Sequence, residues 1–246
     1  MTIRGWKIRY DEIGDVFGYS KYDDLISAKK LNSIIRKKYP ISSIKKIISG
    51  KTVFIIGAGP SLSRSISTIK KYKNVTKIVA DGAVKALIEN NIKPEILVTD
   101  LDGDLASIKK IGKTNIPIIV HAHGNNYDDL DIVSQFRNKI GTTQTKKFGR
   151  LENFGGFTDG DRCVFLAENF NPKEIILFGM DFGEKIGRYS KKRVKDRKVK
   201  LRKLKYGKKL LEWLSQKTNS QLYTTSNPIR GFKTIRFVDL KYIINN

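Results

Sequence analysis

From Lys51 onward, short apolar runs alternate with stretches of helical spacing, and this alternation constrains the fold more than any other feature. The runs are rich in Ile and Val and too short for helices, which indicates buried strands. They lie at residues 53–56, 78–80, 96–99, 116–120 and 175–178. Helical spacing follows at 62–71, 84–90 and 105–111. Strands that alternate with helices predict right-handed crossovers and therefore a mostly parallel sheet.

The expected fold class is α/β, with a Rossmann-like, mostly parallel sheet flanked by helices. Residues 51–184 would form this α/β catalytic domain. Residues 1–50 precede it as a small helical N-terminal region, in which residues 22–39 and 41–48 carry apolar side chains at helical spacing.

The C-terminal part, residues 185–246, is expected to complete the domain. Leucines recur at helical spacing among lysines there, which predicts an amphipathic basic helix over about 198–217. Two late strands are expected at 221–224 and 234–239.

Positive charge dominates the chain and gathers in one place. The net charge is +24, from 48 Lys and Arg and 24 Asp and Glu, so we expect an anionic partner. Residues 185–209 hold 14 of the basic side chains and one acid, Asp196. This run could be a solvated face, a lid that brings cations onto a polyphosphate, or a nucleic-acid patch. We favour the lid and the solvated face, because few aromatic residues interrupt the run.

Targeting and redox features are sparse. No run approaches about 20 apolar residues, and the first seven residues lack the apolar core of a signal peptide. Cys163 is the only cysteine, which excludes an intramolecular disulfide and a cysteine zinc site. We therefore expect a cytoplasmic protein with no membrane partner.

Acidic residues follow two of the expected strands. Asp81 comes after 78–80, and Asp100, Asp102 and Asp104 come after 96–99. The carboxyl ends of parallel strands meet at the edge of the sheet where ligands bind. Two carboxylates about 4 Å apart repel by roughly 4 kcal/mol at an effective dielectric of 20, so a counter-cation is expected.

Oxygen ligands and neighbouring phosphates suit Mg²⁺. We predict that Asp100 and Asp102 bind the metal with help from Asp81, and that an extended chain turns Asp100 and Asp102 to one face. Alternatives remain open: Asp81 could hold a ribose or cap a helix, Asp104 could be a cap, and the others could form a solvated acidic turn.

A glycine-rich turn, Gly57-Ala58-Gly59-Pro60-Ser61, separates the first strand of the sheet from a helix. Such a turn can bring backbone N–H groups and a helix N-terminus to a phosphate, so Gly57, Gly59, Pro60 and Ser61 are predicted to bind a nucleotide. Gly82 would leave room for the same ligand. Leu62 replaces the third glycine of the dinucleotide pattern, which argues against an NAD site. The alternative is a tight turn without a ligand.

Two further segments carry candidate residues. His121 and His123 end a strand, and His123 is expected to contact phosphate or substrate, with a structural role equally open. The loop Gly155-Gly156-Phe157-Thr158-Asp159-Gly160-Asp161-Arg162 precedes a helix expected at 163–169. Gly156, Thr158 and Asp159 would wrap a ligand. Either Asp159 or Asp161 could instead cap the helix.

Taken together, these motifs resemble the archaeal 6-hydroxymethyl-7,8-dihydropterin pyrophosphokinase family (MptE-like). The resemblance runs through Gly57-Ala58-Gly59-Pro60-Ser61-Leu62, Asp81-Gly82-Ala83, Asp100-Leu101-Asp102-Gly103-Asp104, His121-Ala122-His123-Gly124, the glycine-rich loop and Gly179-Met180-Asp181. It covers nearly the whole chain. The acids also resemble those of thiamin pyrophosphokinase. Asn125 departs from the family pattern, where an acid is expected.

The resemblance implies Mg²⁺-dependent transfer of a diphosphoryl group from ATP to the pterin hydroxymethyl oxygen, with release of AMP. ATP and a pterin alcohol would then be the substrates. The catalytic residues would be Asp81, Asp100, Asp102 and Asp161, the last orienting the hydroxyl or binding the pterin edge.

The alternatives are a thiamin pyrophosphokinase, a nucleotide-sugar glycosyltransferase, and a nucleic-acid binding module built on the basic helix. The oligomeric state and the choice between folate and methanopterin synthesis stay open.

Overall fold

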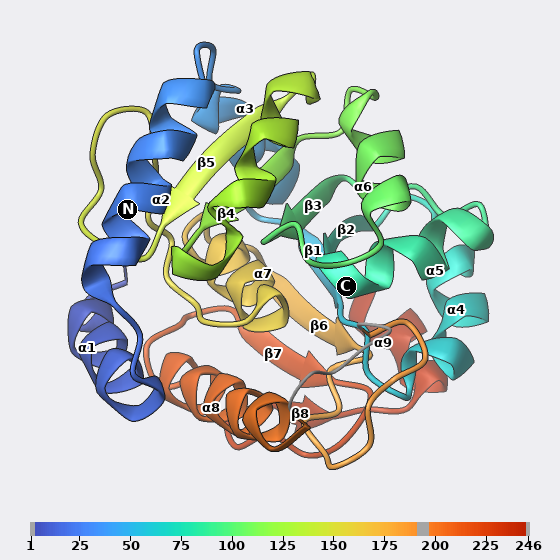
Figure 1. The fold of residues 1–246 in the computed structure, drawn as a ribbon. Helices are drawn as coiled ribbons and strands as arrows, with labels where there is room; N and C mark the ends of the chain where they lie inside the picture. Colours follow the sequence, from blue (N-terminus) through green and yellow to red (C-terminus); the bar gives the residue numbers. More distant parts are fainter. Residues whose placement is uncertain (1–2, 191–196, 245–246) are drawn as a thin grey trace.

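The computed structural model describes residues 3–190 and 197–244 and contains one eight-stranded sheet (Figure 1). All strand pairs in it are parallel, which confirms the expected fold class. The spatial order is β5-β4-β3-β2-β1-β6-β7-β8. The strands are β1 (Thr52–Ile56), β2 (Thr76–Ala80), β3 (Ile96–Thr99), β4 (Ile118–Ala122), β5 (Lys139–Thr143), β6 (Glu174–Phe178), β7 (Gln221–Thr224) and β8 (Lys233–Thr234).

Helices cover both faces of the sheet. They are α1 (Trp6–Phe17), α2 (Lys21–Ile34), α3 (Ile41–Ile48), α4 (Leu62–Lys71), α5 (Val84–Glu89), α6 (Leu105–Gly112), α7 (Asp159–Glu168), α8 (Arg197–Leu214) and α9 (Leu240–Ile244). Short 3₁₀ turns include η1 (Asp81–Ala83), η2 (Gly124–Asn126), η3 (Asp128–Gln135) and η4 (Phe237–Asp239).

The sheet has a core on each face, because successive strand residues point to opposite sides. Phe54 and Ile56 of β1 pack with apolar residues of α2, α4, α5 and α6. Val53 and Ile55 pack with residues of α1, α3, α7 and α8. The three N-terminal helices are thus built into the same cores as the sheet.

The structure corrects several expected elements. Helix α1 and strand β5 were not predicted, and α2 ends at Ile34 rather than near residue 39. The last strand stops at Thr234, and a 3₁₀ turn occupies Phe237–Asp239 where a strand was expected. Strand β5 escaped prediction because Ile140 is its only large apolar residue.

The basic helix α8 packs against α7 through buried Leu210, Leu211 and Leu214. Residues 191–196 of the basic run lie outside the described residues. Within the part of the chain that the structure describes, no helix is long and apolar enough to cross a membrane.

Candidate active site

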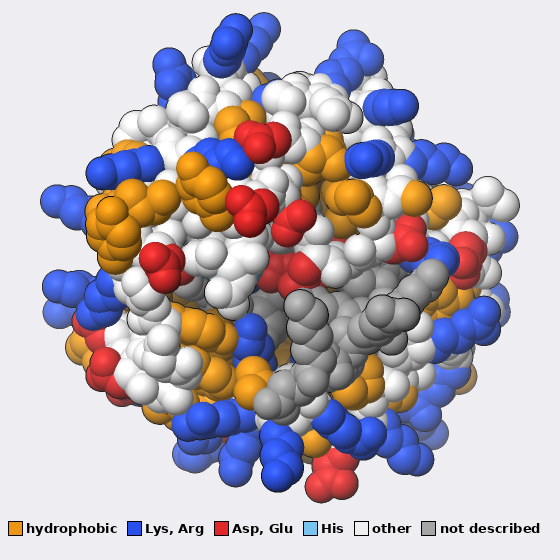
Figure 2. All heavy atoms as spheres, viewed as in Figure 1, with side chains coloured by type: hydrophobic (Ala, Val, Ile, Leu, Met, Phe, Trp, Pro, Cys, Tyr) orange, Lys and Arg blue, Asp and Glu red, His pale blue; other side chains and the backbone are white. Residues whose placement is uncertain are grey.

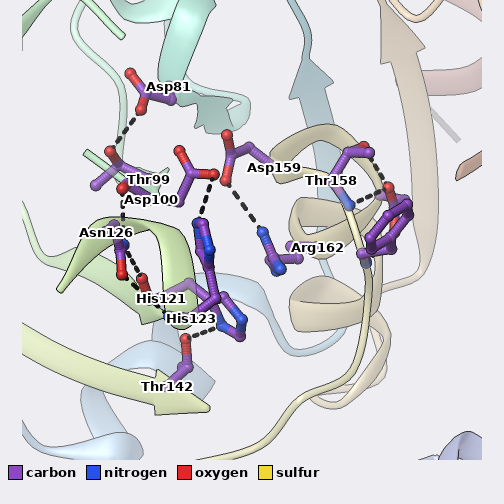
Figure 3. Close-up of polar contacts among 12 residues, drawn as sticks. Asp81, Thr99, Asp100, His121, His123, Asn126, Thr142, Thr158, Asp159 and Arg162 are labelled. Carbon is purple, nitrogen blue, oxygen red and sulfur yellow. Dashed lines mark hydrogen bonds and ion pairs between the residues drawn. The ribbon is translucent and has the colours of Figure 1, made fainter. Parts of the chain in front are cut away.

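Four carboxylates converge at the carboxyl edge of the sheet. Asp81 follows β2, Asp100 and Asp102 follow β3, and Asp159 begins α7. One oxygen from each lies within 4.8 Å of the others. Figure 3 shows the side chains of Asp100 and Asp159 next to each other, with Asp81 close by and hydrogen-bonded to Thr99. The three acids expected to bind a metal therefore lie together, and Asp159 joins them as a fourth.

The turn after β3 places Asp100 and Asp102. Leu101 between them has φ 73°, in the left-handed region that branched side chains rarely adopt. Its N–H donates to the Thr99 hydroxyl at 2.8 Å. The chain is therefore not extended here, which is the condition under which alternation would turn both acids to one face. The strained turn, rather than the alternation of a strand, brings both acids into the cluster.

Asp81 is the buried anchor of the cluster. Its Oδ2 accepts hydrogen bonds from the Thr99 hydroxyl at 2.7 Å and the Gly103 N–H at 3.1 Å. Its Oδ1 is buried and has no hydrogen-bond partner among the residues that the structure describes. Burial, and then the charges of Asp100 and Asp102, raise the pKa of Asp81 to about 7.

Asp159 experiences the same environment. Burial and the charges of Asp100 and Asp81 raise the pKa of Asp159 well above its ordinary value. Arg162 Nη1 lies 3.6 Å from the Asp159 carboxylate and offsets part of this repulsion. Closely spaced carboxylates with an orphaned buried oxygen suit a divalent cation, because its charge removes the repulsion that otherwise favours a proton.

Neighbouring polar groups hold the cluster in place. His123 Nε2 lies 3.3 Å from Asp100 Oδ2. The Asn126 amide donates to the backbone carbonyls of Asp100 at 2.8 Å and His121 at 2.7 Å, and so ties the ends of β3 and β4 together. His123, expected to contact substrate, therefore also positions an acid of the cluster.

Asp161 occupies a capping position at the start of α7, one of the two roles that the sequence left open. It is fully buried, and its carboxylate accepts hydrogen bonds from the N–H groups of Phe157 at 2.6 Å and Thr158 at 2.8 Å. The Thr158 hydroxyl donates to it as well. With both oxygens occupied, Asp161 stabilises the start of α7. Asp104 likewise caps α6 through Ser107.

The glycine-rich turn after β1 is bound by the protein itself. The N–H and hydroxyl of Ser61 donate to Asp181 Oδ2 at 3.0 and 2.9 Å. The Gly59 N–H donates to the Gly179 carbonyl at 2.7 Å, and a Cβ at Gly59 would lie 2.2 Å from Asp181 Oδ2. The turn has these glycines because the loop after β6 packs against it.

This arrangement corrects the predicted nucleotide contacts. The amides of Gly57, Gly59 and Ser61 already have partners, so they do not form the expected phosphate cradle. Pro60 is exposed at the surface of the turn. A Cβ at Gly82 would lie 3.0 Å from the Tyr189 carbonyl, so its small size makes room for the chain around residue 189. Asp181 was missed as the partner of Ser61 because 120 residues separate them.

A pocket lies beside the acids, between the start of α2, the turn η2 and α8. Its lining includes Asp100, His123, Arg162, Tyr19 and Lys203. Lys203 Nζ lies 5.4 Å from the centre of the Tyr19 ring, within cation–π distance. Figure 2 shows acidic side chains near the centre of this face, with Lys and Arg around its rim.

The glycine-rich loop before α7 borders this pocket. Gly156 has φ 92°, and a Cβ there would lie 2.6 Å from the Arg162 Cα. Its glycine therefore lets the loop pack against the first turn of α7. Figure 3 shows the Arg162 side chain joined to Asp159 by their ion pair.

Comparison with known proteins agrees with this geometry. Residues 27–187 match the family described as 6-hydroxymethylpterin diphosphokinase MptE-like. The chain belongs to this family. The 6-hydroxymethyl-7,8-dihydropterin pyrophosphokinase of Methanocaldococcus jannaschii is 42% identical over 88% of this chain and 97% of its own. The enzyme of the same name from Pyrococcus furiosus is 39% identical over 88% and 96%.

A solved structure shares the fold of this MptE-like chain. The MAf glycosyltransferase from Magnetospirillum magneticum AMB-1 superposes with a TM-score of 0.61 at 15% identity. The match covers 88% of this chain and 38% of that one. At this identity the similarity concerns the fold alone.

Proposed function

We propose that this chain transfers a diphosphoryl group from ATP to the hydroxymethyl oxygen of 6-hydroxymethyl-7,8-dihydropterin and releases AMP. The observation that carries the proposal is the four-acid cluster beside an open pocket, in a chain of the MptE-like family. Relatives that carry the name of this activity match nearly their whole length.

The cluster fits Mg²⁺. Asp81, Asp100 and Asp102, together with Asp159, would hold the ion, since Mg²⁺ prefers carboxylate oxygens and phosphates. When bound, Mg²⁺ draws electron density from the phosphate oxygens and makes the β-phosphorus a better electrophile. The orphaned Oδ1 of Asp81 supports this assignment.

The side chains of the protein supply position and charge. Diphosphoryl transfer requires the alcohol oxygen, the β-phosphorus and the leaving AMP to lie in line, so orientation and electrostatics dominate catalysis. His123 and Asn126 hold Asp100 in place at the pocket wall. Lys203 of α8 would neutralise charge on the phosphates, since it lines the same pocket.

The partners follow from this reaction. We expect ATP and a pterin alcohol as substrates and a cytoplasmic location. The alternative for the basic helix is a nucleic-acid partner. A role for α8 in catalysis is favoured, because Lys203 of this helix lines the pocket beside the acids.

Product analysis by mass spectrometry tests the proposal. With Mg²⁺, ATP and the pterin alcohol, the enzyme should yield AMP and a diphosphorylated pterin in equal amounts. Asp102→Asn should lower turnover roughly a hundredfold or more without altering the fold, because Asp102 is exposed. Asp104→Asn is the matched control, since Asp104 caps α6. A folded protein that forms ADP, or no nucleotide product, contradicts the proposal.

A further inference from the structure

Arg162 is a buried cation whose hydrogen-bond donors are not all used by the protein. The residue is 7% exposed, and its Nε–H has no hydrogen-bond partner within the described part of the chain. Its ion-pair partner is Asp159, but the 3.6 Å between Nη1 and the carboxylate is longer than a hydrogen bond (Figure 3). Buried donors without acceptors are costly, so a ligand that accepts from Arg162 would stabilise this site.

Arg162 lines the pocket beside the acids, and a second cation lines it as well. Lys203 of α8 makes cation–π contacts with Tyr19 and Phe157, and its amine has no hydrogen bond or ion pair to any residue that the structure describes. The pocket has room for a few water molecules, and hence for a phosphate group. Two cations from different helices therefore meet at one space of suitable size.

The acids around the pocket do not cancel these cations once a divalent ion is bound. Asp24 has both carboxylate oxygens occupied by hydrogen bonds from the protein, and Asp23 is exposed to solvent. Asp100 and Asp159 belong to the four-acid cluster, so a bound ion would take up their charge. Arg162 would then lose much of its pairing with Asp159 and attract a new anion.

We propose that Arg162 binds the non-bridging oxygens of the diphosphoryl group that is transferred, with Lys203 as the second cation. The proposal rests on the proposed function and names the side chain that holds the transferred group. A guanidinium can donate two parallel hydrogen bonds to a phosphate. A neutral pterin carbonyl would leave its buried charge uncompensated, so a phosphate is the better ligand.

Helix α7 fixes the position of this cation relative to the metal site. Asp159 and Arg162 are three residues apart at the start of α7, so their side chains lie one helical turn apart on the same face. A phosphate oxygen bound by Arg162 therefore lies next to a carboxylate of the cluster.

Calorimetric titration with inorganic pyrophosphate at saturating Mg²⁺ tests the proposal without turnover. Arg162→Met removes the charge and should raise the Kd for pyrophosphate about tenfold to a hundredfold. Arg162→Lys keeps the charge without the planar fork and should give an intermediate Kd. Arg137→Met is the matched control, because Arg137 is exposed and lies before β5, at the opposite edge of the sheet; its Kd should equal that of the wild type.

Titration with Mg²⁺ alone separates phosphate binding from a positioning role. If Arg162 only held Asp159 in place, Arg162→Met would bind Mg²⁺ more weakly. Under the proposal this variant should bind Mg²⁺ at least as tightly as the wild type, because a positive charge beside the acids is removed. Weaker Mg²⁺ binding, or an unchanged pyrophosphate Kd at a native melting temperature, overturns the proposal.

The wild-type protein provides a test that does not depend on the folding of variants. In a proton–nitrogen NMR spectrum, the Nε–H signal of Arg162 should shift when pyrophosphate is added to the Mg²⁺-loaded protein, and its exchange with solvent should slow. An Nε–H signal that stays unchanged while pyrophosphate binds overturns the proposal.

Failure of the proposed function is distinguishable from these outcomes. Pyrophosphate binding that depends on Arg162, in a protein that forms no AMP from ATP and the pterin alcohol, supports the site and refutes the proposed reaction. AMP formation by Arg162→Met at the wild-type rate, with an unchanged pyrophosphate Kd, refutes the site and leaves the reaction intact.

Discussion

Asp81 should make the metal-free protein less stable as the pH rises. Burial and the charges of Asp100 and Asp102 raise its pKa from an ordinary 3.8 to about 7. Between these values the folded state keeps a proton that the unfolded chain has released, so the free energy of unfolding falls with pH. The slope is about 1.4 kcal/mol per pH unit, and the full difference corresponds to roughly 4 kcal/mol.

Replacement of Asp81 by Asn removes this titration. The Asn side-chain oxygen can accept the hydrogen bonds from Thr99 and Gly103, and its NH₂ group faces the acids without charge. Urea unfolding in EDTA should show wild type losing stability from pH 5 to pH 7 and Asp81→Asn losing less, with the remaining slope due to Asp159, whose pKa is also raised. Saturating Mg²⁺ should restore the wild type at pH 8 and have little effect on the variant.

Asp104→Asn controls for a general charge effect. Hydrogen bonds from Ser107 lower the pKa of Asp104, so the charged carboxylate stabilises the folded protein at neutral pH. Asp104→Asn should therefore be less stable than the wild type at neutral pH, whereas metal-free Asp81→Asn should be more stable than the wild type. Equal unfolding midpoints for metal-free wild type at pH 5 and 7, or a full pH slope in Asp81→Asn, would refute the reasoning.

Three further predictions concern the cluster and its supports. Gly103→Ala places a Cβ 1.8 Å from Asp81 Oδ1, so the Mg²⁺ concentration for half-maximal activity should rise about tenfold or more. Gly14→Ala is the control and should leave this concentration unchanged, because no atom of the described residues lies within 4 Å of its Cβ. Asp159→Asn should lower turnover about a hundredfold and leave the free energy of unfolding nearly unchanged. Asp161→Asn should lower the free energy of unfolding in urea by about 1–2 kcal/mol and leave the Mg²⁺ dependence of activity unchanged. The reverse pattern would contradict the capping role of Asp161. Ser61→Ala should lower the free energy of unfolding by about 1 kcal/mol, because a hydrogen bond to Asp181 is lost, and should leave the KM for ATP unchanged. A large rise in the KM for ATP at native stability would instead support phosphate binding by the turn after β1.

Much of the fold was predictable because buried parallel strands are continuous apolar runs. Strands β1, β2 and β3 each contain an uninterrupted buried apolar run, at 53–56, 78–80 and 96–98, so the pattern locates them. Strand β5 lies at the edge of the sheet and includes Lys139, Gly141 and two threonines, so its sequence carries no such pattern. Helix α1 was missed because charged residues interrupt its apolar spacing.

The candidate site was predictable to the extent that its residues follow strands. Asp81, Asp100 and Asp102 end neighbouring strands, and the structure places them together. Asp159 and Asp161 could not be separated, because an aspartate at a helix start can be either a ligand or a cap. Contacts between residues far apart in the sequence could not be predicted. One example is the Asp181 carboxylate, which accepts a hydrogen bond from the Ser61 N–H where a phosphate was expected.

The four carboxylates come from three separate segments of the chain, after β2, after β3 and at the start of α7. A single bound ion would therefore cross-link these segments at the carboxyl edge of the sheet. At low magnesium concentration these segments would separate more often, and amide hydrogen exchange and protease cleavage would increase there first. Cellular magnesium would then govern the lifetime of the protein as well as its turnover.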